Sequence, residues 1–361
     1  MEHSRKTCIA VFFGGQSSEH EVSIQSAKNV VAAIDSKKYQ IVPVYISKSG
    51  RFFECSSEVF SNIAGMDGLD SNIFQNEKKE MSFAMGGKGK CFYVNESGKE
   101  LTVDFAFPVL HGAFGEDGSV QGLLRMAGIP FAGPGIVGSA VGMDKDVAKR
   151  LLKNDGFLVA DCVVGRKCDR DKLVFSDIQK KLGIPMFVKP ANAGSSVGVS
   201  KVETEEEFFK AVDEAFVHDV KILIEEAIVG REIECSVLGN EYPEASVLGE
   251  VTPTHDFYSY DAKYLDSNGA ILKIPADLPE SVSDNVRKQA VDVFKCLECF
   301  GMTRVDFFVT QDFKVYVNEV NTIPGFTSIS MYPKLWEVSG VGYGELIGRI
   351  IELGMEKHEK L

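Results

Sequence analysis

Apolar and polar positions follow one another in blocks that predict strands and helices in alternation. Residues 9–13 and 41–46 are short apolar runs typical of buried strands, and residues 19–34 between them have helical periodicity. Residues 105–110 form a further apolar run, and residues 121–127 again have helical spacing. Strands that alternate with helices predict a βαβ domain with a mostly parallel sheet.

The remaining segments predict a loop-rich insertion and two further domains. Residues 49–103 carry little periodicity and many Gly, Ser and Asn residues, so we interpret them as short strands and loops inserted into the first domain. Helices and strands mix in the middle of the chain, whereas strands dominate its last third. We therefore expect an α/β and α+β protein with domains at residues 1–132, 133–229 and 230–361.

Composition and charge narrow the class of protein. The 361 residues are 44% hydrophobic and 25% charged, as in an ordinary globular enzyme. The 39 basic and 52 acidic residues give a net charge of −13, which argues against a nucleic-acid or membrane partner. No stretch approaches the roughly 18 apolar residues that span a bilayer. The eight cysteines are scattered, so we expect reduced thiols and a cytoplasmic protein.

A hairpin between Arg304 and Asn321 carries the most informative chemistry. A turn centred on residues 312–313 would place Asp306 opposite Glu319 and Arg304 opposite Asn321, with all four side chains on one face. Facing carboxylates repel each other, so the pair suggests a cation between them, and oxygen ligands suit Mg²⁺ better than zinc. Taken alone, the segment is also compatible with an exposed hairpin that carries scattered charge.

Two glycine-rich segments are candidates for substrate contacts. Residues 188–202 place Gly194, Ser195 and Ser196 between apolar strand residues, which predicts a hairpin flap whose tip suits phosphate oxygens; an ordinary β-turn is the alternative. The second glycine-rich segment lies near the N-terminus, where the predicted strand at residues 9–13 is followed by Gly14 and Gly15 and, four residues later, by Glu19. This carboxylate either complements a helix dipole or binds a substrate ammonium at the edge of the sheet.

Three further features point toward the same site. The long loop at residues 252–269 is rich in aromatics and is either an active-site lid or a packed surface loop, with Lys263 available to a carboxylate. Gly325 follows the hairpin directly, so its N–H group would lie near the metal. His111 ends a buried strand and either faces the cleft or is a satisfied buried histidine.

In combination these segments resemble the D-alanine–D-alanine ligases of the ATP-grasp superfamily. The resemblance runs from Gly14 to Ser330 through GGQSSEHEVS, HGAFGEDGSVQG, GMDKDVAK, VKPANAGSSVGVSKV, SYDAKY, TRVDFF and NEVNTIPGFTS. It implies a three-domain ATP-grasp fold that ligates two D-alanines to D-alanyl-D-alanine through an acyl phosphate, for peptidoglycan precursor synthesis. It further implies ATP and D-alanine as substrates, two Mg²⁺ ions that Mn²⁺ can replace, and a homodimer.

The resemblance also implies a role for individual residues. Nucleotide contacts would come from Lys145, Lys189, Gly194, Ser195, Ser196, Glu225, Glu226, Ile228 and Glu232. The metal ligands would be Asp306, Glu319 and Asn321. The D-alanine molecules would contact Glu19, His111, Lys263, Tyr264, Arg304, Gly325, Ser330 and Met331. The catalytic set would be Glu19, Ser195, Tyr264, Arg304, Gly325 and Ser330, with Tyr264 docking the lid onto Ser195.

The departures from the family pattern are modest and leave two alternatives open. Glu226 stands where many relatives carry Lys, and Met331 replaces a frequent Leu. A D-Ala–D-lactate or D-Ala–D-Ser ligase would share this scaffold, although Lys263 and Tyr264 keep the form typical of the dipeptide enzymes. A catalytically silent ATP-binding module is the other alternative, and the complete set of polar residues on the hairpin disfavours it.

Overall fold

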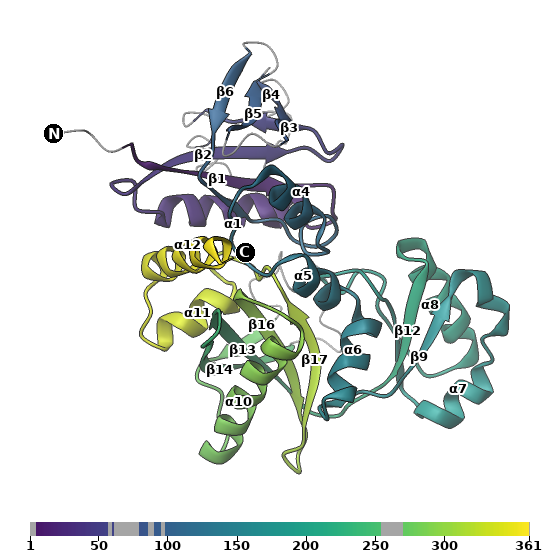
Figure 1. Ribbon diagram of the computed structural model, residues 1–361. Helices are drawn as coiled ribbons and strands as arrows, with labels where there is room; N and C mark the ends of the chain where they lie inside the picture. The colour runs from purple at the N-terminus through teal and green to yellow at the C-terminus, as the bar shows by residue number, and fades with distance from the viewer. Residues whose placement is uncertain are drawn as a thin grey trace.

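Three β-sheets form three lobes around a common centre (Figure 1). The computed structural model describes residues 5–56, 60, 79–85, 90–94, 98–253 and 270–360. The N-terminal lobe and the middle lobe, which contains residues 162–226 and is teal in the picture, both adjoin the C-terminal lobe (Figure 1). The domain boundaries given above stay a prediction.

The first sheet has seven strands in the order β6-β5-β4-β3-β2-β1-β7. Their bounds are β1 (Thr7–Gly14), β2 (Tyr39–Ile46), β3 (Phe52–Glu54), β4 (Glu80–Phe83), β5 (Lys90–Val94), β6 (Lys99–Thr102) and β7 (Phe105–Pro108). The predicted parallel core is present, because β1 pairs in parallel with β2 and β7. Strands β3 to β6 extend it by antiparallel pairing, so the sheet is mixed rather than mostly parallel. The connections between β2 and β3, β4 and β5, and β5 and β6 are too short for a crossover, so these pairs can only be antiparallel.

Both faces of this sheet are buried, as the continuous apolar run in its first strand predicts. Ile9, Val11 and Phe13 pack into one hydrophobic core and the alternating Ala10 and Phe12 into another. The helices around this sheet are α1 (His20–Ala33), α4 (Ser119–Ala127) and α12 (Tyr343–Glu359). Helix α12 joins α1 in the first core, so the C-terminus of the chain closes the N-terminal lobe (Figure 1).

The second sheet is antiparallel and carries the predicted flap. Its strands, in order, are β11 (Ser200–Val202), β10 (Met186–Pro190), β12 (Lys221–Glu226) and β9 (Cys162–Arg166). Its remaining elements are the 3₁₀ helix η1 (Lys167–Lys172), α7 (Phe175–Leu182) and α8 (Glu205–His218). Strands β10 and β11 pair as a hairpin, so residues 191–199 form a loop that projects from the sheet edge.

The third sheet has six strands and contains the predicted metal hairpin. The strands, in order, are β15 (Ala270–Lys273), β14 (Glu244–Pro253), β13 (Arg231–Gly239), β16 (Gly301–Val309), β17 (Val315–Asn321) and β8 (Leu158–Val159). The associated helices are α5 (Ile136–Met143), α6 (Lys145–Asn154), α10 (Glu280–Cys296) and α11 (Met331–Val338). Residues of α6 and β8 share a core with α10, so α6 bridges the second and third sheets (Figure 1).

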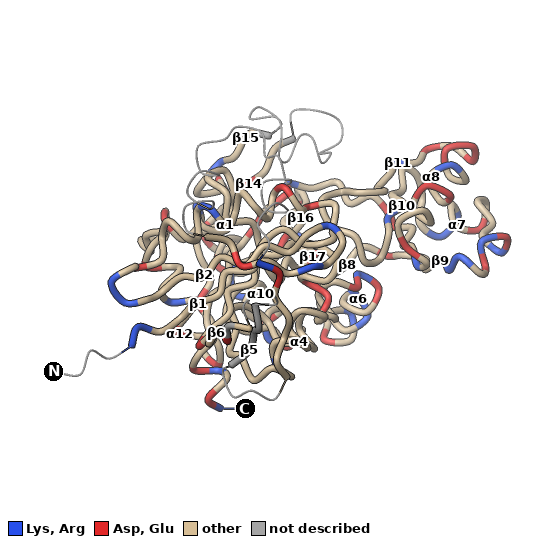
Figure 2. Tube along the Cα trace, turned by 90° about the horizontal axis from the view of Figure 1, so that it is seen from above, with Lys and Arg blue, Asp and Glu red and all other residues tan. Residues whose placement is uncertain are grey.

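Acidic and basic residues are interspersed along the surface (Figure 2). The cysteines at the described positions are all free thiols. Within the ranges that the structure describes, no helix has both the length and the apolar character that crossing a membrane requires.

Candidate active site

The β16–β17 hairpin has the predicted pairing at the polar face. Asp306 lies opposite Glu319, and Arg304 lies opposite Asn321. Since all four positions face the same side of the sheet, their side chains converge on one surface. The predicted pairing of these four residues across the hairpin is therefore confirmed.

The turn of the hairpin differs from the prediction. Val309 pairs with Val315, and Phe313 adopts a φ of 60° to close a three-residue loop. The turn is therefore centred on residue 312 rather than between residues 312 and 313. The register returns to the predicted one through a bulge, in which Asn318 is the extra residue. Without that bulge Glu319 would point to the opposite face, because a shift of one residue reverses every side chain.

Arg304 links the acids of two neighbouring strands, β13 and β16. Its Nε lies 2.7 Å from Asp306 Oδ1, and its Nη2 lies 2.8 Å from Asp306 Oδ2. The same Nε lies 3.0 Å from Glu234 Oε2 on β13, and Asn321 Nδ2 donates to Asp306 Oδ2 at 2.9 Å. The guanidinium therefore offsets the repulsion between two carboxylates that face each other across β13 and β16.

The hairpin residues fit a hard cation by their chemistry. Asp306, Glu319 and Asn321 offer carboxylate and amide oxygens on one face, and Mg²⁺ prefers such donors. Among the described residues, no three His, Cys, Asp or Glu side chains form a metal cage of their own. This agrees with the usual coordination of Mg²⁺, which is bound by one or two carboxylates together with water and substrate phosphates.

The flap ends in a tight turn whose backbone is exposed to the cavity. Ser195 and Ser196 have φ values of 51° and 59°, and the Val197 N–H donates to the Gly194 carbonyl at 3.1 Å. Two successive positive φ values are typical of a type I′ turn. The geometry is the predicted hairpin flap, with backbone N–H groups and hydroxyls at its tip.

Glu19 meets the flap tip. It immediately precedes α1, yet its side chain makes no capping hydrogen bond; the Ser195 hydroxyl instead donates to its carboxylate. A Cβ atom on Gly194 would lie 2.8 Å from Glu19 Oε2, and one on Gly112 would lie 2.6 Å from it. Both loops thus approach this buried carboxylate closely, and the φ of 72° at Gly112 additionally favours glycine there. The Glu19 side chain therefore contacts the flap tip rather than capping the helix.

His111 is a neutral, fully engaged side chain at the base of the cleft. Burial lowers its pKa, although Glu19 partly offsets the shift. Its Nδ1 donates to the Ile323 carbonyl at 3.0 Å, because a carbonyl can only accept, and its Nε2 lies 3.2 Å from the Ser26 hydroxyl. Both ring nitrogens therefore have protein partners, so the ring lines the cleft and positions the loop after β17.

Glu116 is a partly buried carboxyl that the sequence analysis did not select. Its Oε2 accepts from the Gly112 N–H at 2.8 Å and its Oε1 from the Ile323 N–H at 2.9 Å. Burial and the Glu19 carboxylate raise its pKa to about 7, while these two N–H groups act in the opposite direction. Glu116 therefore joins the loop after β7 to the loop that leaves the metal hairpin.

Two lysines and Glu225 form a charged wall of a second cavity, and a third lysine, Lys149, pairs with Glu225. Lys189 Nζ lies 2.7 Å from Glu225 Oε2, and Lys149 Nζ lies 3.2 Å from Glu225 Oε1. Burial acts to raise the pKa of Glu225, but the two lysines outweigh it and hold the pKa below its usual value. Burial lowers the pKa of Lys145, with Glu319 offsetting part of the shift. Lys145 Nζ lies 3.9 Å from Glu319 Oε2, so this wall reaches the metal hairpin.

The predicted residues line two adjoining cavities of about 380 Å³ and 280 Å³. The larger, called the substrate cleft here, contains Glu19, His111, Arg304, Asp306, Asn321, Gly325, Ser330 and Met331. The smaller, called the nucleotide pocket, contains Lys145, Lys189, Ser196, Glu225, Glu226 and Ile228. Their shared border consists of Gly194, Ser195, Glu232, Asn318 and Glu319. Lys263 and Tyr264 lie outside the described residues.

The sequence analysis did not select several of the lining or contacting residues. Those that are polar or charged include Glu116, Lys149, Glu234, Asn318, Thr327 and Lys334. Lys149 was within reach of sequence reasoning, because it lies one helical turn after Lys145. Glu234 shares a strand face with Glu232, two residues away. Asn318 had no such signal, since its position depends on the bulge.

Two family models match this chain. One, described as the D-ala D-ala ligase N-terminus, matches residues 8–134, and the other, the D-ala D-ala ligase C-terminus, matches residues 151–352. The chain belongs to the D-alanine–D-alanine ligase family. Its three-sheet architecture is the ATP-grasp fold of that family.

Relatives and solved structures agree with this family over almost the whole chain. The D-alanine–D-alanine ligase of Oceanobacillus iheyensis is 51% identical over 98% of this chain and 97% of that protein. Ligase A of Escherichia coli K12 is 46% identical, with 98% and 97% covered. The ligase structure from Coxiella burnetii superimposes with a TM-score of 0.88 at 40% identity, over 99% of this chain and 96% of that one. The VanG D-Ala:D-Ser ligase of Enterococcus faecalis gives 0.86 at 35% identity, over 97% and 100%.

Proposed function

We propose that this chain ligates two D-alanines to D-alanyl-D-alanine at the expense of ATP, for peptidoglycan precursor synthesis. The observation that carries the proposal is the common border of the two cavities, where the flap tip, Glu19 and Glu319 converge. A phosphate group at that border would face both the nucleotide pocket and the substrate cleft. That arrangement suits transfer of a phosphoryl group from ATP to a carboxylate in the cleft.

The nucleotide would occupy the smaller cavity. Its apolar lining, which includes Ile228 and Phe308, suits the adenine ring, and Lys145 and Lys189 suit the phosphates. The flap tip would cover the γ-phosphate with the backbone N–H groups of Gly194, Ser195 and Ser196. Two Mg²⁺ or Mn²⁺ ions at Asp306, Glu319 and Asn321 would neutralise charge on the phosphates.

The first D-alanine would bind with its ammonium at Glu19. Its carboxylate is a poor acyl donor, so one carboxylate oxygen first attacks the γ-phosphorus while the bond to the β-phosphate oxygen breaks. ADP leaves, and an acyl phosphate remains in the cleft. The residues of this chain contribute position and charge to that step, since Lys145 and Lys189 face the transferred group.

The second D-alanine would bind at Ser330 and Lys263 through its carboxylate. Its amine nitrogen attacks the acyl carbon, and phosphate departs as the amide forms. Negative charge develops on the acyl oxygen in the tetrahedral state, and Arg304 and the Gly325 N–H are the proposed donors to it. A closed flap and lid would exclude water, which otherwise hydrolyses the acyl phosphate.

A phosphate-release assay with identified products tests the proposal. D-alanine should stimulate phosphate release and yield the dipeptide by mass, whereas L-alanine should not. The similarity to VanG makes a D-Ala–D-Ser ligase the second candidate, so D-serine and D-lactate are offered in competition with D-alanine. Exclusive formation of D-Ala–D-lactate or D-Ala–D-Ser at neutral pH would overturn the choice of second substrate. Nucleotide binding without any turnover would indicate a silent ATP-binding module.

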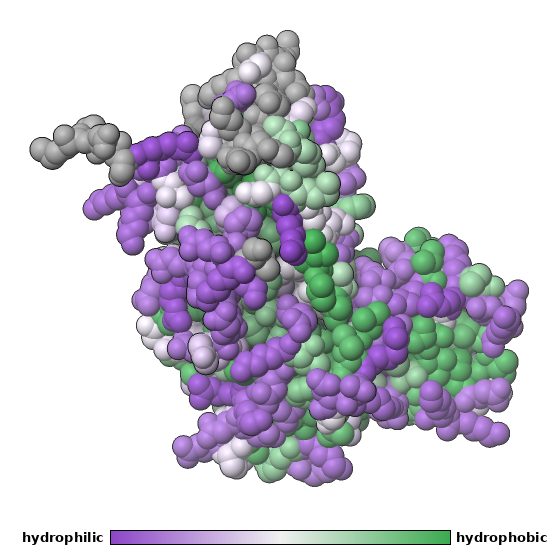
Figure 3. All heavy atoms as spheres, in the orientation of Figure 1, coloured by the Kyte–Doolittle hydropathy of each residue, from purple (hydrophilic) through white to green (hydrophobic). Residues whose placement is uncertain are grey.

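We also propose a cytoplasmic homodimer. Exposed apolar side chains on α4 and α5, namely Met126, Ile136 and Val137, would be covered in such an assembly. Hydrophobic atoms are visible along α5 on the face shown in Figure 3. Sedimentation equilibrium of the full chain would return twice the mass of 39.6 kDa if the proposal holds.

A further inference from the structure

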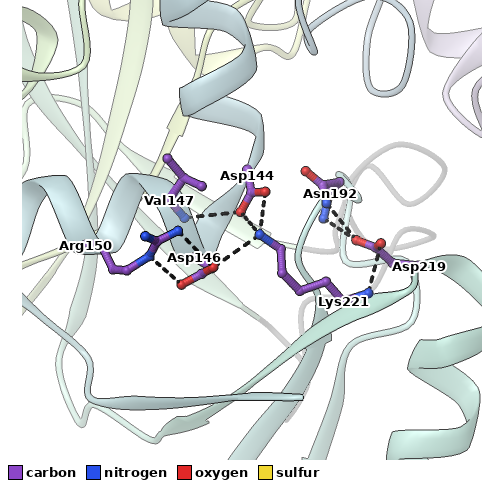
Figure 4. Close-up of polar contacts among 7 residues, drawn as sticks. All are labelled: Asp144, Asp146, Val147, Arg150, Asn192, Asp219 and Lys221. Carbon is purple, nitrogen blue, oxygen red and sulfur yellow. Dashed lines mark hydrogen bonds and ion pairs between the residues drawn. The ribbon is translucent and has the colours of Figure 1, made fainter. Parts of the chain in front are cut away.

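Lys221 is a buried cation with no part in the mechanism above. It opens β12 and points toward the first turn of α6 (Figure 4). Its Nζ donates to both carboxylate oxygens of Asp144, at 2.6 Å from Oδ1, and lies 3.2 Å from Asp146 Oδ2. A lysine is rarely buried to 8% exposure unless it is paired, so the two aspartates account for its position.

Asp144 has a second partner in the helix itself. It is the N-cap residue of α6, and its Oδ1 accepts from the Val147 N–H at 3.1 Å. Asp146, which lies between Lys221 and Arg150, also accepts from Arg150 Nε at 3.0 Å (Figure 4). The ammonium of Lys221 therefore fixes the start of α6 against the start of β12.

The root of the flap joins the same cluster. The Ala191 N–H donates to the Lys221 carbonyl at 2.9 Å, and the Lys145 N–H donates to the Ala191 carbonyl at 3.1 Å. Asp219 Oδ2 accepts from the N–H and the side-chain amide of Asn192, at 2.8 Å and 2.9 Å, while its Oδ1 accepts from the Lys221 N–H. Three segments distant in sequence are thus joined at one point (Figure 4).

This point lies directly behind the nucleotide pocket. Lys145 follows Asp144 in the chain, and its Nζ donates to the Ala193 carbonyl of the flap at 2.7 Å. A displacement at the start of α6 would therefore move Lys145 and the flap root together. Mispositioned groups of this kind cost catalysis more than they cost folding.

We propose that Lys221, through Asp144, is a positioning residue for the nucleotide, which holds Lys145 and the flap root in their binding geometry. The inference rests on the proposed role of Lys145 as a phosphate contact. A buried ion pair adds little net stability compared with apolar packing, because desolvation of the charges offsets their attraction. An apolar side chain at position 221 would not reproduce the directional contacts that Lys221 makes to Asp144 and Asp146.

Lys221→Met in the full chain tests the inference. We expect the KM for ATP and the calorimetric Kd for ADP with Mg²⁺ to rise about tenfold, the low end for partners that orient a ligating group. The KM for D-alanine should stay unchanged, and Lys221→Arg should recover part of the loss. A purely structural role would lower the melting temperature without this selective effect on the nucleotide.

Two further variants keep the test decisive. Asp144→Asn retains the N-cap acceptor but removes the charge that holds Lys221, so it should reproduce the rise if Lys221→Met does not fold. Arg150→Met removes a different cation from Asp146, so it should leave nucleotide affinity unchanged and controls for net charge. Equal ADP affinity in folded Lys221→Met, folded Asp144→Asn and the unaltered chain would overturn the inference. Failure of the unaltered chain to bind ADP would instead overturn the proposed function.

Discussion

The nucleotide pocket and the substrate cleft adjoin each other but balance their charges differently. In the pocket, Glu225 pairs with Lys149 and Lys189, and the described lining contains four acids, Glu225, Glu226, Glu232 and Glu319, against Lys145 and Lys189. In the cleft the described lining contains six acids, Glu19, Glu116, Glu232, Glu234, Asp306 and Glu319, against Arg304 and Lys334. The surplus of carboxylates predicts that the cleft binds cations, namely a substrate ammonium and metal ions.

The two regions also differ in how the chain builds them. The lysines and the glutamate of the pocket come from α6 and two paired strands, β10 and β12. The cleft needs the start of α1, the loop after β7, the flap tip and the β16–β17 hairpin together. Charge substitutions in the cleft should therefore act mainly on ligand binding, whereas those at the paired lysines and Glu225 of the pocket should act on local structure as well as on nucleotide binding.

The largest effect is expected from Glu319→Gln. Loss of a metal-binding charge at the border of the two cavities should lower turnover by more than about 10³-fold. The melting temperature should stay close to that of the unaltered chain, because Glu319 is partly exposed and its ion pair with Lys145 is long, at 3.9 Å. Phosphate release and thermal unfolding measure the two quantities. Asp312→Asn at the hairpin turn is the control, and retained turnover in Glu319→Gln would remove the metal hairpin from the mechanism.

Arg304→Met should reduce turnover by about 10²–10³-fold, as expected for a lost oxyanion donor. It also removes the cation shared by Asp306 and Glu234, so Mn²⁺ should bind more tightly in the absence of nucleotide. Phosphate release and Mn²⁺ calorimetry measure the two effects. Arg231→Met, which removes a comparable Arg–Glu pair elsewhere on the same sheet, should change neither. Weaker Mn²⁺ binding in Arg304→Met would contradict the surplus of acid in the cleft.

Glu116 gives the cleft a pH-dependent contribution to stability. Its pKa is raised to about 7 in the folded chain from an ordinary 4.5, so folding favours the protonated form. This contribution is complete below pH 4.5 and is lost as the pH rises to about 7, a change of about 3 kcal/mol. Urea unfolding of the unaltered chain and of Glu116→Gln across this range measures it. The difference in unfolding free energy between the two should change with pH, and a constant difference would refute the assignment.

The smallest effect is expected from Glu226→Gln in the nucleotide pocket. Glu226 Oε1 accepts from the Asp161 N–H at 2.7 Å, and a glutamine oxygen can replace it. The side chain is partly exposed, so we expect a change in the KM for ATP of about twofold or less. ATP titration of the phosphate-release assay is sufficient. A larger rise would show that the Glu226 charge itself contacts the nucleotide.

Local pattern predicted most of the elements and much of the site. The alternating arms of the hairpin placed Asp306 and Glu319 opposite each other, and the glycine-rich run at 188–202 predicted the flap. Pattern predicted short strands within residues 49–103, but not that they would extend the first sheet, because pairing partners rather than propensity decide where such strands lie. It also missed Glu116, whose significance comes from a contact with Ile323, 207 residues away.

The sequence by itself determined which segments carry chemistry, since turn residues, apolar runs and carboxylate spacing are local properties. Only the tertiary structure decided how these segments meet. The bulge at Asn318 sets the face of Glu319, and Glu19 meets Ser195 across 176 residues of chain. Such contacts depend on how three sheets and their helices pack together, and no local pattern encodes that packing.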